Sequence, residues 1–403
     1  MNRREFAKIV LSGGAGALLN QAFGRKLPAK SLDDVLALPP PVVNTFSSEI
    51  VLNSRLSYHS GYSGALSDQI LANILWACDK APMLGTNRTI YAAHSENVYR
   101  YDPSRHNLII HRTGNWMSQA GHAFEIGIAG DLAEDAGSAL HYGHLAATSF
   151  WQTTSNQPSC CPKESGATNA NTNWNPTRTI QMVNCHGLMK TVAGITAQLV
   201  AQSSDGTLST PSTNGTVIVE NALANLKYGS RFLSTELTLP QISQLAWASY
   251  GNSPHTAGGK GGLVVASAVA GYFMTARIYI VRSIGVERYH IRLPSGEQST
   301  RDHRIERVIA GDRRARLCAA LPRLPATAPN FFVFCADLVA RWRLIEAGYA
   351  GASALLQASS INLQGFFTGN FTSSERTTIQ TALGIPSEDL PLLIFSTGTP
   401  ATG

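Results

Sequence analysis

Three stretches of the chain repeat apolar residues at the spacing of a helix. Residues 66–77 and 239–249 each begin at a residue whose hydroxyl can cap a helix N-terminus, Ser67 and Thr238. Residues 342–359 form a longer pattern with small residues, among them Gly348, on one face. Such a face lets another backbone approach closely. We therefore predict three helices, the last in a tight helix contact.

Short runs of β-branched and aromatic residues predict strands. They lie at residues 276–282, 330–336 and 392–396. Residues 157–177 are rich in Ser, Thr, Asn, Gly and Pro, and we predict a long loop there. Residues 301–316 interleave arginines with acids, which favours a solvated helix face.

The order of these patterns occurs twice. Arg55 lies 21 residues before Trp76 in the first copy, and Lys227 lies 20 residues before Trp247 in the second. Further along each copy, Asp131, Gly143 and Gln152 recur, with spacings equal to within one residue, as Asp337, Gly348 and Gln357. A period of more than 100 residues is too long for a solenoid repeat. We predict two tandem domains, 46–202 and 215–403, joined by a polar linker at 203–214.

The N-terminus resembles a twin-arginine export signal. Arg3 and Arg4 precede Phe6 and Lys8, and a weakly apolar stretch follows that is too short to span a bilayer. The alternative is an ordinary amphipathic first helix. We predict that residues 1–30 are an export signal and that the mature protein is periplasmic or otherwise extracytoplasmic. No later apolar run is long enough for a transmembrane helix.

Removal of that segment changes the charge. The whole chain carries a formal charge of +6, but residues 1–30 hold six Lys or Arg and one Glu, which leaves +1. A nucleic-acid partner requires a basic stripe in the folded part. The only basic run, 301–316, is interrupted by acids. We therefore predict no nucleic-acid partner.

The cysteines admit two interpretations. In an oxidising compartment, Cys185 can pair with Cys160 or Cys161. A zinc site formed by these three and His186 is disfavoured, because adjacent cysteines reach two corners of a tetrahedron poorly and no C-x-x-C spacing occurs. We predict no metal site. Cys318 and Cys335 lie among apolar residues and are predicted to be buried thiols.

The second copy resembles the nitroreductase family of flavin enzymes, and within it the branch that oxidises azoline rings in peptides. The segments that carry this resemblance are 227–231 (KYGSR), 233–251, 266–281, 311–321, 328–337, 345–371 and 383–400. The first copy is more loosely similar, through 66–82, 97–111, 124–131 and 141–152.

The resemblance implies an α+β, three-layer fold with a mixed sheet, formed by an intertwined dimer that holds FMN at its interface. Two tandem copies would form the same arrangement as an intrachain pseudo-dimer. Family members usually end with a basic residue after the last strand, whereas this chain ends without one. The first copy is also shortened between Pro82 and Tyr99. We therefore expect one FMN per chain, or none.

The family binds the FMN phosphate with an Arg-x-Ser-x-Arg segment. Positive charge and hydrogen-bond donors suit a dianionic phosphate. The equivalent positions in this sequence are Arg55, Ser57 and His59 in the first copy and Lys227, Gly229, Ser230 and Arg231 in the second. A basic residue near a serine is common on any protein surface, so the flanking matches carry this assignment.

Two further segments are implied to contact the flavin ring. A backbone amide near N5 would come from the loop 362–365, with Gln364 and Gly365, and glycine suits close approach to a flat ring. A Pro-Ser-Ala-like segment from the partner domain corresponds to 266–268, with Ser267 at its centre. The alternative for Ser267 is a hydroxyl that bonds its own backbone. The first-copy equivalent, near Tyr91, has lost the pattern.

The resemblance implies hydride transfer through flavin N5 to or from a small molecule or peptide, with a possible redox partner. Catalytic residues are not assigned; His255, Tyr272, Tyr279 and Tyr289 are possible proton-transfer groups. The alternative is an exported, non-catalytic protein that has lost flavin and serves binding or assembly. A hydrolase is disfavoured, since no G-x-S-x-G elbow occurs.

Overall fold

The structure is a computed structural model. It describes residues 35–57, 62–63, 65–118, 121–151, 158–189, 208–257, 260–268, 272–274, 277–291 and 301–401. The predicted export signal, 1–30, and His59 lie outside the described residues and stay predictions.

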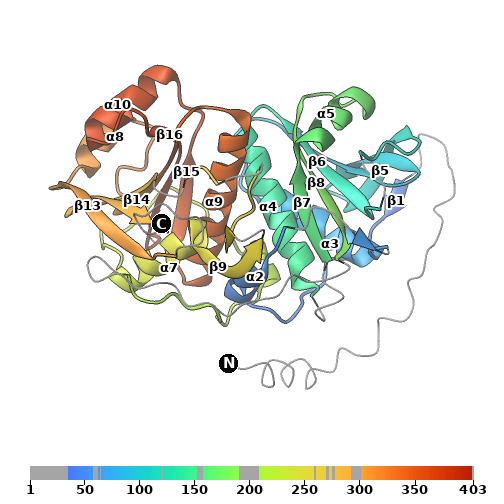
Figure 1. Cartoon of the computed structure of the whole chain (residues 1–403), viewed down its shortest axis with the longest axis horizontal. Helices are drawn as coiled ribbons and strands as arrows, with labels where there is room; N and C mark the ends of the chain where they lie inside the picture. Colours follow the sequence, from blue (N-terminus) through green and yellow to red (C-terminus); the bar gives the residue numbers. More distant parts are fainter. Residues whose placement is uncertain are drawn as a thin grey trace.

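The first half of the chain forms one α+β unit, which lies on the right in Figure 1. Its elements are β1 (Val35–Ala37), α2 (Ser48–Ser54), β2 (Tyr62–Ser63), α3 (Asp68–Lys80), β3 (Arg88–Ala93), β4 (Asn97–Asp102), β5 (Asn107–Thr113), β6 (Phe124–Gly130), α4 (Ala133–Ser149), β7 (Pro158–Lys163), α5 (Glu164–Asn173) and β8 (Ile180–Met189). The sheet has the order β1-β5-β4-β3-β6-β8-β2, with β7 also paired to β8.

The second half forms the unit on the left in Figure 1. Its elements are α6 (Val219–Ala224), α7 (Leu239–Tyr250), β9 (Asn252–Ala257), β10 (Lys260–Leu263), β11 (Ile278–Arg282), β12 (Gly285–His290), β13 (Arg304–Ala310), α8 (Arg314–Ala320), β14 (Asn330–Ala336), α9 (Arg341–Ser360), β15 (Gln364–Thr368), α10 (Ser373–Leu383) and β16 (Leu390–Gly398). The main sheet has the order β13-β12-β11-β14-β16-β15, and β9 and β10 form a separate hairpin.

The two sheets have the same topology. The order β5-β4-β3-β6-β8-β7 matches β13-β12-β11-β14-β16-β15 strand for strand in chain order. The irregularities match too: β6 shifts register against β8 between Ile128 and Ala129, and β14 shifts against β16 between Phe334 and Cys335, at the same place in each strand. Bulges re-aim strands and are built into a fold. The two halves therefore share one backbone plan.

Helices α4 and α9 join the halves. They run side by side in the same direction, since Ser138 Oγ donates to Gly348 O at 3.1 Å and Tyr142 Oη donates to Ala352 O at 3.0 Å. A Cβ on Gly137 would lie 2.2 Å from the carbonyl oxygen of Ile345, and one on Gly348 would lie 2.1 Å from that of Glu134. The glycines therefore allow the two backbones to touch.

The interface is intertwined as well as packed. The chain before α2 and the chain before α6 exchange backbone hydrogen bonds, Ser48 N to Val217 O and Val219 N to Phe46 O, both at 3.0 Å. Helix α2 contacts α9 and β9 of the second half, while α6 contacts α3 and α4 of the first. One continuous apolar core includes both central helices and one face of each sheet. The other face of each sheet packs against outer helices, α5 or α8 and α10.

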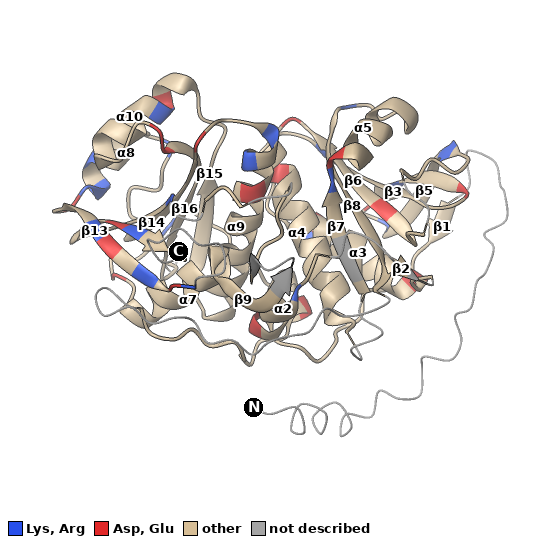
Figure 2. Ribbon diagram, viewed as in Figure 1, with Lys and Arg blue, Asp and Glu red and all other residues tan. Residues whose placement is uncertain are grey.

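Charged residues are sparse on the central helices. Figure 2 shows those of α4 and α9 near one end of each helix, and the remaining turns are uncharged. Helix α9 is the longest helix, yet it and the other helices of the described chain are too short or too polar to cross a bilayer.

The predicted helices are confirmed with their caps. Ser67 accepts from Ile70 N at the start of α3, and Thr238 forms a capping box with Gln241 at the start of α7. The predicted strand at 330–336 matches β14, and those at 276–282 and 392–396 match β11 and β16 within a few residues. Ladder pairing among the described strands is antiparallel, with one isolated parallel bridge between Tyr228 and Gly365, so the expected mixed sheet is largely antiparallel.

Two local predictions are wrong. The expected loop at 157–177 contains β7 and α5, because Ala167, Ala170 and Trp174 are buried against the sheet and hold a helix of weak intrinsic propensity. The expected helix at 301–316 contains the edge strand β13 and only the start of α8. The adjacent residues Glu306 and Arg307 of β13 are exposed, whereas Ile305 packs against the core. Charged edge strands resist pairing with other chains.

The repeat was aligned incorrectly along the central helices, at the Gly143 and Gln152 landmarks. The counterpart of Gly348 is Gly137, since the two approach each other's helices in the same way. Gly143 instead packs against Ile74 and Cys78 of α3. The described part of the proposed linker, 208–214, is anchored: Leu208 is buried and Ser212 bonds to Gln244. The domain boundaries stay predictions.

We expect Gly348→Ala to lower the free energy of unfolding by about 1 to 3 kcal/mol, because the added Cβ must push the backbones of α4 and α9 apart. Chemical denaturation checks this. Gly85→Ala is the matched control, since a Cβ there would sit at an ordinary 3.5 Å from Leu132. Equal stability of the two variants would show that the helix contact is loose.

Candidate functional site

The structure brings six of the predicted contact residues together in the second half. The segment Lys227–Arg231 runs beside the start of β15, with Gly229 N donating to Gly365 O at 3.0 Å and Gly365 N donating to Lys227 O at 2.9 Å. Gln364 Nε2 donates to Arg231 O at 2.9 Å. We call this group the second-half cluster.

The second-half cluster carries two cationic side chains near the surface. Lys227 is half-buried and its Nζ lies 2.8 Å from Asn362 Oδ1, while Ser230 and Arg231 are exposed. Among the described residues, neither Lys227 nor Arg231 forms an ion pair with a carboxylate. Their charge is therefore available to an anion.

Both glycines of this cluster have structural explanations. A Cβ on Gly229 would lie 2.9 Å from the Gln364 amide, and one on Gly365 would lie 2.1 Å from the Phe395 ring. The Gly365 amide, which the resemblance assigns to flavin N5, donates to the Lys227 carbonyl instead. The close packing of β15 thus accounts for Gly365 without a ligand.

The remaining described residues meet where the two halves cross. Arg55 is 3% exposed. Its Nε donates to Val264 O at 2.8 Å, its Nη2 to Leu263 O at 2.8 Å and Val265 O at 2.7 Å, and its Nη1 to Ser57 Oγ at 3.1 Å. The guanidinium therefore holds the backbone that leads into the predicted ring contact, Ser267.

Histidines surround Arg55 and are held neutral. Burial, then the Arg55 charge, lower the pKa of His255 to about 4, and the same two effects lower the pKa of His141 and His144 well below the ordinary value. His255 Nε2 lies 2.9 Å from Ser54 O, and His144 Nε2 lies 3.2 Å from Leu56 O. At neutral pH this layer adds no positive charge for an anion.

The segment for the ring differs between the halves. Residues 251–277 separate α7 from β11 and include 266–268, whereas only residues 81–87 separate α3 from β3. The first half thus lacks a segment equivalent to 266–268 that could reach the second-half cluster. The residues predicted to contact the flavin therefore lie in two places: the cations are in the second-half cluster, and the predicted ring segment, 266–268, follows the backbone that Arg55 holds.

Comparisons with known proteins identify the fold. No family model and no curated protein matches the chain. A solved structure of a nitroreductase candidate from Anabaena variabilis is similar over 83% of this chain and 88% of its own, with a TM-score of 0.59 and 14% identity.

The protein has a nitroreductase-like fold. Two other solved structures overlap less: a nitroreductase candidate of Ralstonia eutropha, with TM-score 0.40, 19% identity and coverage of 52% of this chain and 99% of its own, and the E. coli microcin synthetase McbBCD complex, with 0.34, 17%, 44% and 70%. Their scores are too low to add to the assignment, which rests on the Anabaena structure.

Sequence reasoning missed a buried acid beside the ring segment of this nitroreductase-like fold. Glu346 on α9 is fully buried, accepts from Phe273 N at 2.9 Å and accepts from the Tyr250 hydroxyl. Burial raises its pKa to about 7. The available signal in the sequence was a lone acid among the small residues of α9. Only the fold brings Glu346 to this segment, because Phe273, whose amide it accepts, lies six residues after Ser267.

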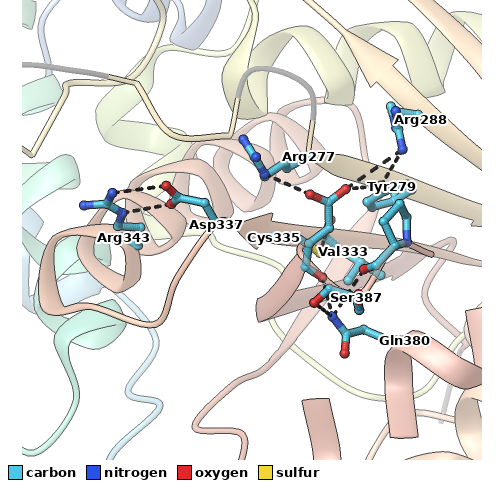
Figure 3. Close-up of polar contacts among 11 residues, drawn as sticks. Arg277, Tyr279, Arg288, Val333, Cys335, Asp337, Arg343, Gln380 and Ser387 are labelled. Atoms are coloured by element: carbon cyan, nitrogen blue, oxygen red, sulfur yellow. Dashed lines mark hydrogen bonds and ion pairs between the residues drawn. The ribbon is translucent and has the colours of Figure 1, made fainter. Parts of the chain in front are cut away.

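A second polar cluster lies on the outer face of the second sheet (Figure 3). Asp389 accepts from Arg277 Nε at 2.8 Å and from the Tyr279 hydroxyl, which in turn accepts from Arg288 Nη2 at 3.0 Å. The repeat landmark Asp337 pairs separately with Arg343 at 3.2 Å. Each carboxylate here already has a cation, so we interpret this cluster as structural. It also accounts for Tyr279, one of the possible proton-transfer groups.

A cavity of about 600 Å³ lies on the first half, away from these residues. Its lining includes Asp79, Met83, Arg88, Arg100 and Tyr101. None of the predicted flavin contacts lines it. Arg88 is already engaged, since it pairs with buried Asp135 at 2.7 Å.

We expect Glu346 to make stability fall as pH rises from 4.5 to about 7. Over this range the native carboxyl keeps a proton that the unfolded chain has lost. The free energy of unfolding therefore falls by up to about 3 kcal/mol and is constant above the native pKa. Buried histidines with lowered pKa act in the opposite direction. The measurement is therefore the difference in unfolding free energy between wild type and Glu346→Gln at several pH values. A difference that does not change with pH would contradict the assignment.

Proposed function

We propose that this protein is an exported FMN-dependent oxidoreductase with one flavin per chain. The observation that carries the proposal is the second-half cluster: two cations without carboxylate partners, in the described chain, beside a close-packed glycine strand, on a nitroreductase-like fold.

The cluster fits the phosphate end of FMN. Lys227 and Arg231 offer charge, and Ser230 adds an exposed hydroxyl on the same segment. A phosphate dianion near two such cations gains charge-assisted hydrogen bonds. Bound there, FMN would supply hydride transfer, to or from a small molecule or peptide. An exported enzyme has little access to NAD(P)H, so a redox partner is the more plausible source or sink of electrons.

The chain's own residues position the predicted ring segment and hold a proton beside it. Arg55 fixes the backbone before Ser267, and Glu346 fixes the backbone after it, at Phe273. With a pKa near 7, Glu346 can keep or release a proton at neutral pH. We further propose that the two halves arose by tandem duplication, which explains their shared bulges and strand order.

A second candidate function is supported by specific observations. Arg55 donates to backbone carbonyls, and the first half is too short at 81–87 to reach a flavin ring. Both features suit a chain that keeps the fold for binding or assembly and has lost flavin. The absorbance spectrum of folded protein separates the two candidates. An absence of flavin bands, with no uptake of added FMN, would leave only the second.

We expect Lys227→Ala and Arg231→Ala each to weaken FMN binding by about tenfold or more, because each removes a charge-assisted hydrogen bond. Quenching of flavin fluorescence measures the affinity. Arg307→Ala is the matched control, since Arg307 is an exposed arginine of β13 outside the cluster. Equal affinities in the three variants would exclude the second-half cluster as the phosphate site.

We expect replacement of both Arg3 and Arg4 by lysine to stop export, because the twin-arginine pathway reads the guanidinium pair itself. Cell fractionation with antibody detection checks this. Lys26→Arg, which changes a basic residue outside the pair, is the control. Export of the double variant at the control's level would contradict the assignment of residues 1–30.

A further inference from the structure

A cluster of metal-binding side chains lies on the outer face of the first sheet, away from α4 and the proposed flavin site. In the strand register, Glu125 of β6 lies opposite Cys185 of β8, which lies opposite Cys161 of β7. All three are buried. His122 lies just before β6 and its side chain is 3% exposed.

The spacing of the ligand atoms suits one metal ion. His122 Nδ1 lies 3.4 Å from Glu125 Oε1, and Cys185 Sγ lies 3.7 Å from the same oxygen. The three ligand atoms all lie within 4.8 Å of one another. A tetrahedral zinc ion, with bonds of about 2.0 to 2.3 Å, has ligand-to-ligand edges of roughly 3.3 to 3.8 Å. The two distances to Glu125 therefore already match the edges of such a tetrahedron.

The charge of the cluster also favours a cation. Glu125 is fully buried, and its one ion pair with the described residues is the His122 contact. A buried carboxylate is costly unless it is paired and hydrogen-bonded. Ser118 N and Ser118 Oγ donate to Glu125 at 2.9 and 2.7 Å. Such bonds orient a ligating carboxylate and leave lone pairs for a metal.

Alternation along β8 explains why the sequence pointed to a different set. Successive residues of a strand face opposite sides of the sheet. His186 therefore lies on the face away from Cys185 and stacks on Phe124 at 5.4 Å. The partners of Cys185 instead come from the H-A-F-E run that begins at His122.

We propose that His122, Glu125 and Cys185 bind a zinc ion, with Cys161 beside Cys185 as the fourth ligand. One imidazole, one carboxylate and thiolates are the ligand types that zinc accepts, and thiolates disfavour magnesium and calcium. A full set of four protein ligands in a buried place makes this a structural site. It replaces our expectation that the chain has no metal site and does not depend on flavin binding.

The test begins with wild-type mature protein purified in reducing buffer without chelator and supplied with Zn²⁺. We expect about one zinc per chain by elemental analysis. Exchange for Co²⁺ is expected to give the intense visible bands of tetrahedral cobalt with thiolate charge transfer. Protein that binds neither ion in stoichiometric amount overturns the proposal.

Variants test the assignment of the ligands. Cys185→Ser is expected to lose the zinc, while Cys335→Ser, which removes a buried thiol of the second half, keeps it. If Cys185→Ser does not fold, Ser118→Ala serves instead, since loss of a bond to a ligand weakens metal binding by about 10- to 100-fold. Unchanged affinity in Ser118→Ala together with zinc retained in Cys185→Ser would overturn the assignment.

A disulfide is the competing outcome. Cys161 and Cys185 face each other across β7 and β8, so oxidation would join them and remove two ligands. Mass spectrometry of protein extracted without reductant, with free thiols alkylated, detects a linked peptide pair. The exported protein is then treated with a mild reductant and Zn²⁺. If Cys161 and Cys185 stay linked and no zinc binds, the metal site is overturned and the pair is a disulfide.

Discussion

The contact between α4 and α9 is the constraint on which the rest of the structure depends. At Gly137 and Gly348 each helix meets a carbonyl of the other at a distance that no side chain tolerates. This contact brings the two sheets close enough to share one apolar core, and it lets the chains before α2 and α6 cross. Arg55 reaches the backbone of the other half only because of that crossing. The site geometry therefore follows from the helix packing.

The same backbone plan carries different chemistry in its two halves. The second half keeps exposed cations at Lys227 and Arg231, while the equivalent Arg55 is enclosed and bonds to carbonyls. The first half instead places thiols and a carboxylate on its outer sheet face, where the second half has the ion cluster around Asp389. The two sheets thus share their strand register and bulges but carry two unrelated sets of polar side chains.

The sequence predicted well what depends on local signals. Caps at Ser67 and Thr238 and the apolar run of β14 are readable without tertiary context. Helix α5 was not predicted because its local propensity is weak. It is stabilised by burial of Trp174, the residue that directly follows it. The placement of Arg55 could not be predicted, since a basic residue near a serine gives no sign that three distant carbonyls will enclose it. Likewise, only the sheet register brings His122 and Cys185 together.

Both halves of the interface belong to one covalent chain, and this has a consequence for assembly. An interface between separate subunits dissociates on dilution, so its occupancy depends on protein concentration. When the partners are linked, the second half sees the first at a fixed effective concentration, which the linkage rather than the cell determines. The contact at Gly137 and Gly348 can then persist at any dilution, whereas free subunits would separate.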